Sequence, residues 1–156
     1  AALARMSPFL PSIGGGKTKF QPVYVGDVAA AIANCIEGGG KPGSVYELGG
    51  PEVFTFRQLL DLTLQYTGRR RAYLPMPFWL AKLQALLMSP LPNALRPITL
   101  DQVKLLQSDN VVSSAAIADG RTLAGLRIAT PAAVAAIVPG YLQRFQPKGQ
   151  YSHYRT

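Results

Sequence analysis

The first half of the chain alternates between short runs that favour strands and longer runs that favour helices, which predicts an α/β arrangement. A strand is expected over Phe20–Val25, followed by a helix that Asp27 caps and that ends at Gly38–Gly40. Further strands are expected over Ser44–Leu48 and Arg71–Leu74. Because two or three strands do not form a stable open sheet alone, we expect these strands to join a larger sheet.

Two capping-box patterns predict helix starts at Thr55 and Thr99. Each threonine precedes a glutamine by three residues, Gln58 and Gln102, so side chain and backbone can bond reciprocally in the first turn. The segment 109–120 consists mostly of polar and small residues and is predicted to be a loop.

Prolines mark two further predicted helices. Pro77 suits the first turn of a helix over Phe78–Met88. Thr130 and Pro131 are expected to start a last helix, from Ala132 to about Phe145. The helix that follows Pro77 has an apolar face formed by Trp79, Leu80, Leu83, Leu86 and Leu87.

Composition narrows the function classes. Hydrophobic residues make up 48% of the chain, which is enough for a packed core, and the formal net charge is +8. A basic excess suits nucleic acid, anionic lipid or an acidic protein, but no module that binds nucleic acid is visible, so no nucleic-acid partner is expected. With one cysteine, Cys35, and one histidine, His153, no disulfide and no metal site are expected.

Two glycine motifs resemble phosphate-binding patterns in their letters but not in their structural context or full spacing. Gly38–Gly43 spells G-x-G-x-x-G, but a predicted helix precedes it and a predicted strand follows, the reverse of the dinucleotide arrangement. Gly16, Lys17 and Thr18 end like a P-loop, but Pro11 stands where its first glycine is required. Both are therefore interpreted as turns.

Catalytic residues of the reductase type are not expected in this chain. A tyrosine that transfers a proton in such enzymes is followed four residues later by a lysine that lowers its pKa. None of the seven tyrosines has a lysine at that distance. The sequence thus predicts no catalytic residue and no residue that binds a cofactor.

Several segments carry a resemblance to known families. Phe20–Ile32 resembles a late strand and helix of the extended short-chain dehydrogenase/reductase family, which includes proteins of the NAD-dependent epimerase/dehydratase type. Tyr46–Glu52 resembles the last strand of that family. More closely, the chain is similar to the nucleotide-binding accessory subunits of respiratory complex I and their bacterial relatives. The segments that carry this second resemblance are Arg70–Arg71, Leu74–Pro77, Ile98–Val103, Leu105–Asn110 and Ile137–Phe145.

The resemblance implies that the chain is the C-terminal part of a longer, Rossmann-like protein. It assigns residues 1–68 to the last strand–helix units of the Rossmann-like domain, 69–147 to a mostly helical subdomain and 148–156 to a tail. It also implies that the parent protein binds NAD or NADP through an N-terminal Rossmann half that lies outside this chain. The chain alone is expected to bind neither, and whether the parent has turnover stays open.

One candidate ligand crevice lies at the carboxyl end of the strand predicted over Phe20–Val25. Open α/β sheets bind ligands at such strand ends, which makes Gln21, Tyr24 and Asp27 candidates. The alternative is that these side chains make polar contacts at a sheet edge and cap a helix.

An alternative function is a protein- or membrane-surface interaction module. The apolar face that contains Trp79, together with Lys82 and Arg69–Arg71, could dock on anionic lipid or on a respiratory complex. The other interpretation of this face is ordinary core. The expected location is cytoplasmic, with peripheral attachment to the inner face of the membrane as the alternative.

Overall fold

The structure is a computed structural model that describes residue 4 and residues 7–90 and 99–146. It is mixed α/β, and its contacts divide the chain into two units interleaved in sequence. Unit 1 comprises Ala1–Lys19, Thr55–Asn110 and Leu142–Thr156, and unit 2 comprises Phe20–Phe54 and Val111–Tyr141. The assignment of residues 1–68 and 69–147 to a Rossmann-like domain and a helical subdomain stays a prediction, and residues 148–156 lie outside the described residues.

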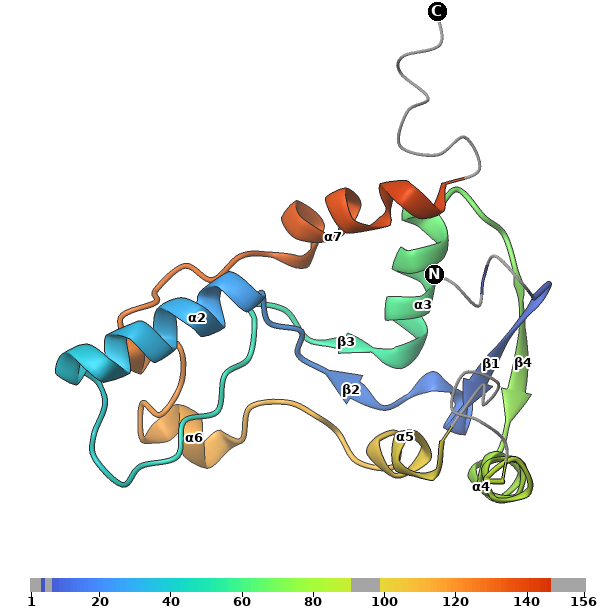
Figure 1. The fold of residues 1–156 in the computed structure, drawn as a ribbon, viewed down its shortest axis with the longest axis horizontal. Coiled ribbons are helices and arrows are strands. Elements are labelled where there is room, and N and C mark those ends of the chain that lie inside the picture. The colour runs from blue at the N-terminus through green and yellow to red at the C-terminus, as the bar shows by residue number, and fades with distance from the viewer. Residues whose placement is uncertain (1–3, 5–6, 91–98, 147–156) are drawn as a thin grey trace, which may run out of the picture. The chain divides into compact units, whose positions relative to one another are not determined.

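Unit 1 is built on a parallel pair of strands, β1 (Phe9–Ile13) and β4 (Ala72–Met76), in register from Phe9 opposite Ala72 to Ile13 opposite Met76. Helix α3 (Phe56–Tyr66) lies beside this pair (Figure 1). Leu64 of α3 packs with Leu10 of β1 in the core of the unit. The strand expected near Arg71–Leu74 is therefore confirmed with a shift of one or two residues, whereas β1 was not predicted.

The two predicted capping boxes both form. Thr55 accepts a hydrogen bond from the Gln58 backbone N–H at 3.2 Å while the Gln58 side chain accepts from the Thr55 N–H at 2.7 Å. Thr99 and Gln102 bond in the same way at the start of α5 (Leu100–Leu105). The helix predicted after Pro77 is α4 (Phe78–Leu87), which packs against α5.

A glycine turn, η1 (Gly14–Gly16), leads from β1 towards β2 (Lys19–Phe20). All three glycines have positive φ, and a Cβ on Gly14 would lie 2.2 Å from the Phe78 ring of α4. Glycine is thus required both by the backbone conformation and by the close packing of α4. Because a strand and not a helix follows the turn, the interpretation of this motif as a turn is confirmed.

Unit 2 has few paired strand residues. Strand β2 pairs with β3 (Phe54–Thr55), and the boundary between the units falls within both strands. The helices are α2 (Val25–Asn34), which continues as a π-helical turn η2 (Cys35–Gly39), α6 (Ser114–Ala118), a 3₁₀ turn η4 (Ala124–Leu126) and α7 (Val134–Leu142), followed by η5 (Gln143–Phe145). Ala31, Leu123 and Leu126 form the core of this unit.

Three predictions in unit 2 were wrong. Of the strand predicted over Phe20–Val25 only Phe20 belongs to a strand, and Ser44–Leu48 forms none among the described residues. A β-strand requires a ladder of backbone hydrogen bonds to a neighbouring strand, and neither segment has one beyond Phe20. Helix α2 begins at Val25, so Asp27 lies inside its first turn and does not cap it.

The predicted loop over residues 109–120 is also wrong, because it contains α6. The Ser113 hydroxyl accepts a hydrogen bond from the Ala116 backbone N–H at 3.1 Å and so caps this short helix. The last predicted helix is confirmed as α7, although it begins two residues later than expected and continues through Pro139.

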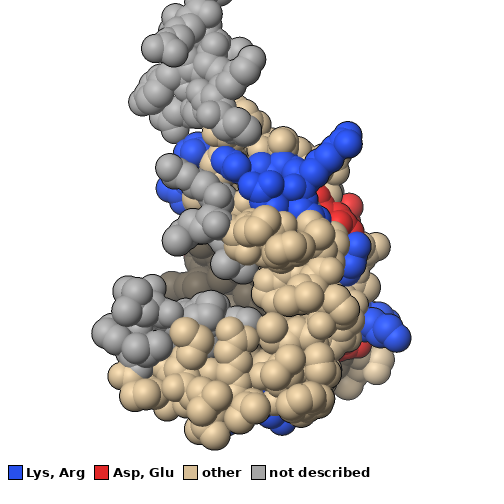
Figure 2. Space-filling model, turned by 90° about the vertical axis from the view of Figure 1, so that its right-hand side faces the viewer, with Lys and Arg blue, Asp and Glu red and all other residues tan. Residues whose placement is uncertain are grey.

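Positive charge is concentrated in unit 1. The described residues of that unit include nine lysines and arginines and three acidic residues, a formal charge of +6, whereas unit 2 has three and five, a formal charge of −2. Figure 2 shows basic side chains gathered on one part of a face whose remainder is almost free of charge. Among the described residues, no helix has the length and hydropathy needed to cross a bilayer.

Removing the cap of α3 should weaken unit 1. We expect Thr55→Ala to lower the free energy of unfolding by about 1 kcal/mol, because one backbone N–H of the first turn loses its partner. Urea unfolding followed by circular dichroism measures the change. The control is Thr130→Ala, an exposed threonine outside any helix; equal effects of the two substitutions would contradict the capping role.

Candidate functional site

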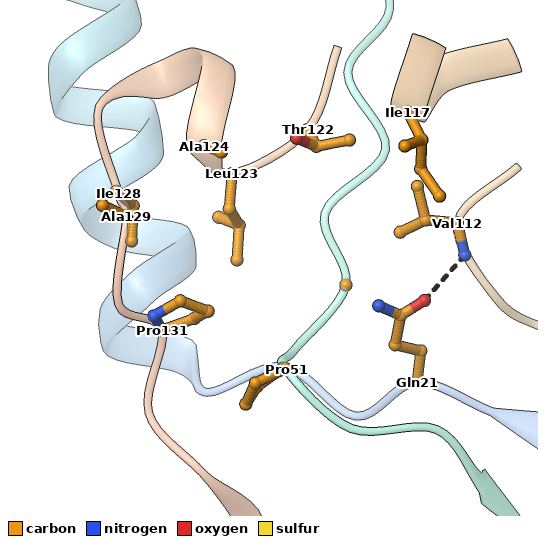
Figure 3. Close-up of a pocket in the computed structure, with 11 residues that line it drawn as sticks. Gln21, Pro51, Val112, Ile117, Thr122, Leu123, Ala124, Ile128, Ala129 and Pro131 are labelled. Carbon is orange, nitrogen blue, oxygen red and sulfur yellow. Dashed lines mark hydrogen bonds between the residues drawn. The ribbon is translucent and has the colours of Figure 1, made fainter. Parts of the chain in front are cut away.

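A pocket with a volume of about 350 Å³ lies within unit 2 (Figure 3). Its wall is formed by the segment before α2, the loop before β3, and residues between 112 and 131. Most lining side chains are apolar, and Gln21 and Thr122 supply the polar ones. The apolar lining side chains include Pro51, Val112, Ile117, Leu123, Ile128 and Pro131.

The Gln21 amide joins two walls of the pocket. Its Nε2 donates to the Gly50 carbonyl oxygen at 2.8 Å, and its Oε1 accepts from the Val112 backbone N–H at 2.9 Å, the bond drawn in Figure 3. Both ends of the amide therefore bond the protein itself. The side chain joins two walls of the pocket, and one of its two N–H donors and one of its two acceptor positions are used in doing so.

Two glycines allow this close approach of the backbone. A Cβ on Gly50 would lie 1.9 Å from the Pro22 carbonyl oxygen, and a Cβ on Gly49 would lie 2.5 Å from Val112 Cγ2. Any larger residue at either position would push the loop away from the segment that carries Gln21. The Gly49–Gly50 pair is thus a packing requirement of the pocket wall.

Glu47 anchors the start of α6. Its carboxylate accepts hydrogen bonds from the Ser113 backbone N–H at 2.7 Å and from the Ser113 hydroxyl at 2.9 Å. These bonds lower the pKa of the Glu47 carboxyl below its ordinary value, and the bond from the Ser113 backbone N–H contributes most. The positive charge of Arg121 also lowers this pKa. Glu47 thus joins two segments that are 66 residues apart in the sequence.

Only one of the three predicted crevice residues lines the pocket. Gln21 does, whereas Tyr24 and Asp27 are not among the lining residues. The Tyr24 carbonyl oxygen accepts the first hydrogen bonds of α2 from the N–H groups of Asp27 and Val28. The Asp27 carboxylate accepts from the Ala132 backbone N–H at 2.8 Å. A ligand-binding role for these three residues stays a prediction.

The residues missed by sequence reasoning come from the segment 112–131. Val112, Ile117 and Leu123 line the pocket, but the first two lie in a segment predicted to be a loop. The Ser113–Ser114 pair before Ala115, Ala116 and Ile117 is a weak helix-start signal that could have indicated α6.

A cluster of titratable side chains in unit 1 joins α3 to β4. The Tyr73 hydroxyl donates to the Asp61 carboxylate, and the Arg57 guanidinium lies 3.3 Å from the Tyr73 ring centroid. Arg57 and Asp61 also form an ion pair at 3.6 Å. Burial, followed by the bond to Asp61, raises the pKa of Tyr73 to about 12, so this phenol is a poor proton donor.

The chemistry that the pocket supports is binding of an apolar group. Its lining contains neither a carboxylate nor a histidine for acid–base work. Within residues 4, 7–90 and 99–146, no group of three side chains that could bind a metal lies together. The glycine motif at Gly38–Gly43 follows α2 and precedes no helix, which confirms a turn.

Comparison with known proteins identifies relatives among subunits of a respiratory complex. The chain is 42% identical to "NADH dehydrogenase [ubiquinone] 1 alpha subcomplex subunit 9, mitochondrial" of Arabidopsis thaliana over 118 residues, covering 70% of the chain and 29% of the relative. The Dictyostelium discoideum protein of the same name is 37% identical over 62 residues, 40% of the chain and 17% of the relative. Over these regions the chain is homologous to the two subunits.

A protein with a different name also matches. "Cyclin-B1-2" of Oryza sativa subsp. japonica is 39% identical over 66 residues, 42% of the chain and 17% of the relative. No family model matches the chain. The chain spans less than a third of the length of each of these relatives.

The anchor at Glu47 should make unit 2 sensitive to acid. We expect Glu47→Gln to destabilise the chain at about pH 7, because Ser113 then bonds a neutral acceptor that is weaker than a carboxylate. Since the folded-state pKa is lowered, the stabilisation is present above the ordinary value of 4.5 and is lost as pH falls through the folded value.

The measurement is thermal unfolding of the wild type and of Glu47→Gln from about pH 7 down to about pH 3. The difference between the two proteins should shrink across the acid end of this range. Glu37→Gln, at an exposed glutamate in η2, is the matched control and should change little. A difference that stays constant with pH would show that the charge of Glu47 does not contribute.

Proposed function

We propose that this chain is the C-terminal region of an NAD(P)-binding protein of the short-chain dehydrogenase/reductase type, related to the accessory subunits of respiratory complex I. The observation that carries the proposal is the 42% identity to an alpha subcomplex subunit over most of the chain. Two of the three relatives bear that name. The resemblance of Phe20–Ile32 to a late strand and helix of the reductase family supports the same assignment.

The exposed surface of α2 supports a longer parent protein. Val25, Ile32 and Ile36 recur at helical spacing on one side of α2 and its π turn, and their exposed fractions are 66%, 55% and 83%. Such a stripe is apolar surface that a packed domain ordinarily covers. In the parent, the N-terminal Rossmann half would cover this stripe with its sheet.

The described residues do not fit the pyrophosphate of a dinucleotide. That group binds where a glycine turn follows a strand and opens a helix, so that free backbone N–H groups point at the phosphates. Here Gly38–Gly43 follows the C-terminal end of α2, whose carbonyl groups repel an anion. We therefore propose that the cofactor site of the parent lies in its N-terminal half.

The pocket beside Gln21 is proposed as the part of this chain that contributes to ligand binding in the parent. Its apolar lining suits the hydrophobic portion of a ligand. Whether the parent catalyses a reaction is not implied by this role. The proposed location is cytoplasmic or peripheral on the inner face of the membrane, in contact with a respiratory complex.

Cofactor binding should require the N-terminal half. We expect NADPH and NADH to leave the melting temperature of the chain unchanged and to raise that of the full parent protein, since a ligand that binds the native state stabilises it. At about 100 times Kd the stabilisation is about 2.7 kcal/mol. Differential scanning calorimetry of both proteins makes the comparison, and saturable micromolar binding by the chain alone would contradict the placement of the site.

The stripe on α2 offers a second test that needs no cofactor. We expect Ile32→Gln with Ile36→Gln to destabilise the parent by about 1.5–3 kcal/mol for each side chain that the N-terminal half buries. The same substitutions should change the chain alone by less than about 0.5 kcal/mol, because both side chains are exposed there. Equal effects in the two proteins would show that the N-terminal half does not cover α2.

A further inference from the structure

Eight of the ten residues of helix α4 are apolar, and its two sides carry residues of different size. The side that packs on unit 1 is lined by the small residues Ala81 and Ala85, which are buried. The opposite side carries the large residues, and Lys82 is the single charged residue of the helix. The exposed large side chains are Trp79, Leu80, Leu83, Leu86 and Leu87.

These five side chains form one continuous surface. At about 100° per residue they occupy an arc of about 120° around the helix axis, with Lys82 at one edge of the arc. Trp79 is 66% exposed and Leu87 is 70% exposed. A large apolar surface of this kind is ordinarily covered by protein or by lipid, so this surface requires a partner.

The charge of unit 1 indicates which partner fits. The described residues of the unit that carries α4 have a formal charge of +6. On the face drawn in Figure 2, most basic side chains gather above an almost uncharged region, and α4 lies at the lower end of that face (Figure 1). An apolar surface on a unit of net positive charge matches the interface of an anionic membrane, where acyl chains lie under negative headgroups.

A second copy of the chain is a poorer partner for the same surface. An isologous contact through α4 would bring together two units whose described residues each carry a charge of +6, and their repulsion opposes association. The surface is also a convex ridge on one helix, which fits a deformable lipid layer.

We propose that α4 docks on an anionic lipid surface, with Leu83, Leu86 and Leu87 entering the headgroup–acyl boundary and Trp79 at the interface. Lys82 contacts the headgroups, and the other basic side chains of unit 1 add a long-range attraction to them. The docking is peripheral, because the helix lies along the surface and does not cross it. None of these residues lines the pocket in unit 2, so the docking surface is distinct from that pocket.

Trp79 is the single tryptophan of the chain, so its fluorescence reports on α4 directly. The experiment adds vesicles of phosphatidylcholine alone, or of equal parts phosphatidylcholine and phosphatidylglycerol, to the full chain. With the anionic vesicles we expect a blue shift of the emission and quenching by lipid brominated in the acyl chain. Phosphatidylcholine vesicles should produce little change, and high salt should weaken the response to anionic vesicles.

Matched variants distinguish vesicle binding through α4 from nonspecific adsorption of the chain to vesicles. Leu83→Gln with Leu86→Gln should lower the partition coefficient at least about tenfold, because two apolar side chains no longer enter the lipid. Lys82→Gln should lower it about fivefold, the effect of one basic residue near the surface. The control, Ile32→Gln with Ile36→Gln, changes exposed apolar residues of α2 and should leave binding unchanged.

Three outcomes would overturn the proposal. The first is an unchanged Trp79 spectrum with anionic vesicles while circular dichroism shows an intact fold. The second is equal loss of binding in the α4 and α2 variants. The third is a dimer in sedimentation velocity that Leu83→Gln with Leu86→Gln dissociates, which would identify another copy of the chain as the partner of α4.

Discussion

Polar side chains that reach across unit 2 replace the strand ladders that this unit lacks. Gln21, Asn34, Glu47 and Asp27 each accept from or donate to the backbone of residues 112–132, at sequence separations between 66 and 105. The Asn34 Nδ2, for example, donates to the Leu126 carbonyl oxygen at 2.7 Å, above the core formed by Ala31, Leu123 and Leu126. Each bond satisfies a backbone group that a sheet would otherwise pair.

This dependence on a few side chains explains why the pocket is held in shape. The Gln21 amide and the Gly49–Gly50 approach fix one wall, and the Glu47–Ser113 bonds fix the start of α6, which carries Ile117 into the lining. Removing one of these side chains leaves its backbone partner without a hydrogen bond. The free-energy penalty of that unsatisfied group is larger than the net stabilisation that the bond had provided. Unit 2 should therefore be more sensitive to single polar substitutions than unit 1, where β1 and β4 form a ladder.

Sequence reasoning succeeded where the signal is local. The boxes at Thr55 and Thr99 and the glycine stop after α2 depend on residues within one turn of each other, and the structure has all three. It failed where a long-range partner decides the outcome. Ser44–Leu48 has strand propensity but no ladder, and Asp27 has the chemistry of a cap but bonds Ala132. Gln21 was proposed because ligands often bind at the carboxyl ends of strands. Its contacts with Gly50 and Val112 depend on residues distant in the sequence and could not be predicted without the fold.

The two exposed apolar helices differ in a way that separates their partners. The stripe of α2 is formed by β-branched residues with alanines beside them, a low surface of the kind that lies flat on a sheet. The surface of α4 is formed by four leucines and a tryptophan, which project further and lie in the basic unit. The two proposals therefore assign different partners to these surfaces: the N-terminal half of the parent protein to the stripe of α2, and an anionic lipid layer to the surface of α4.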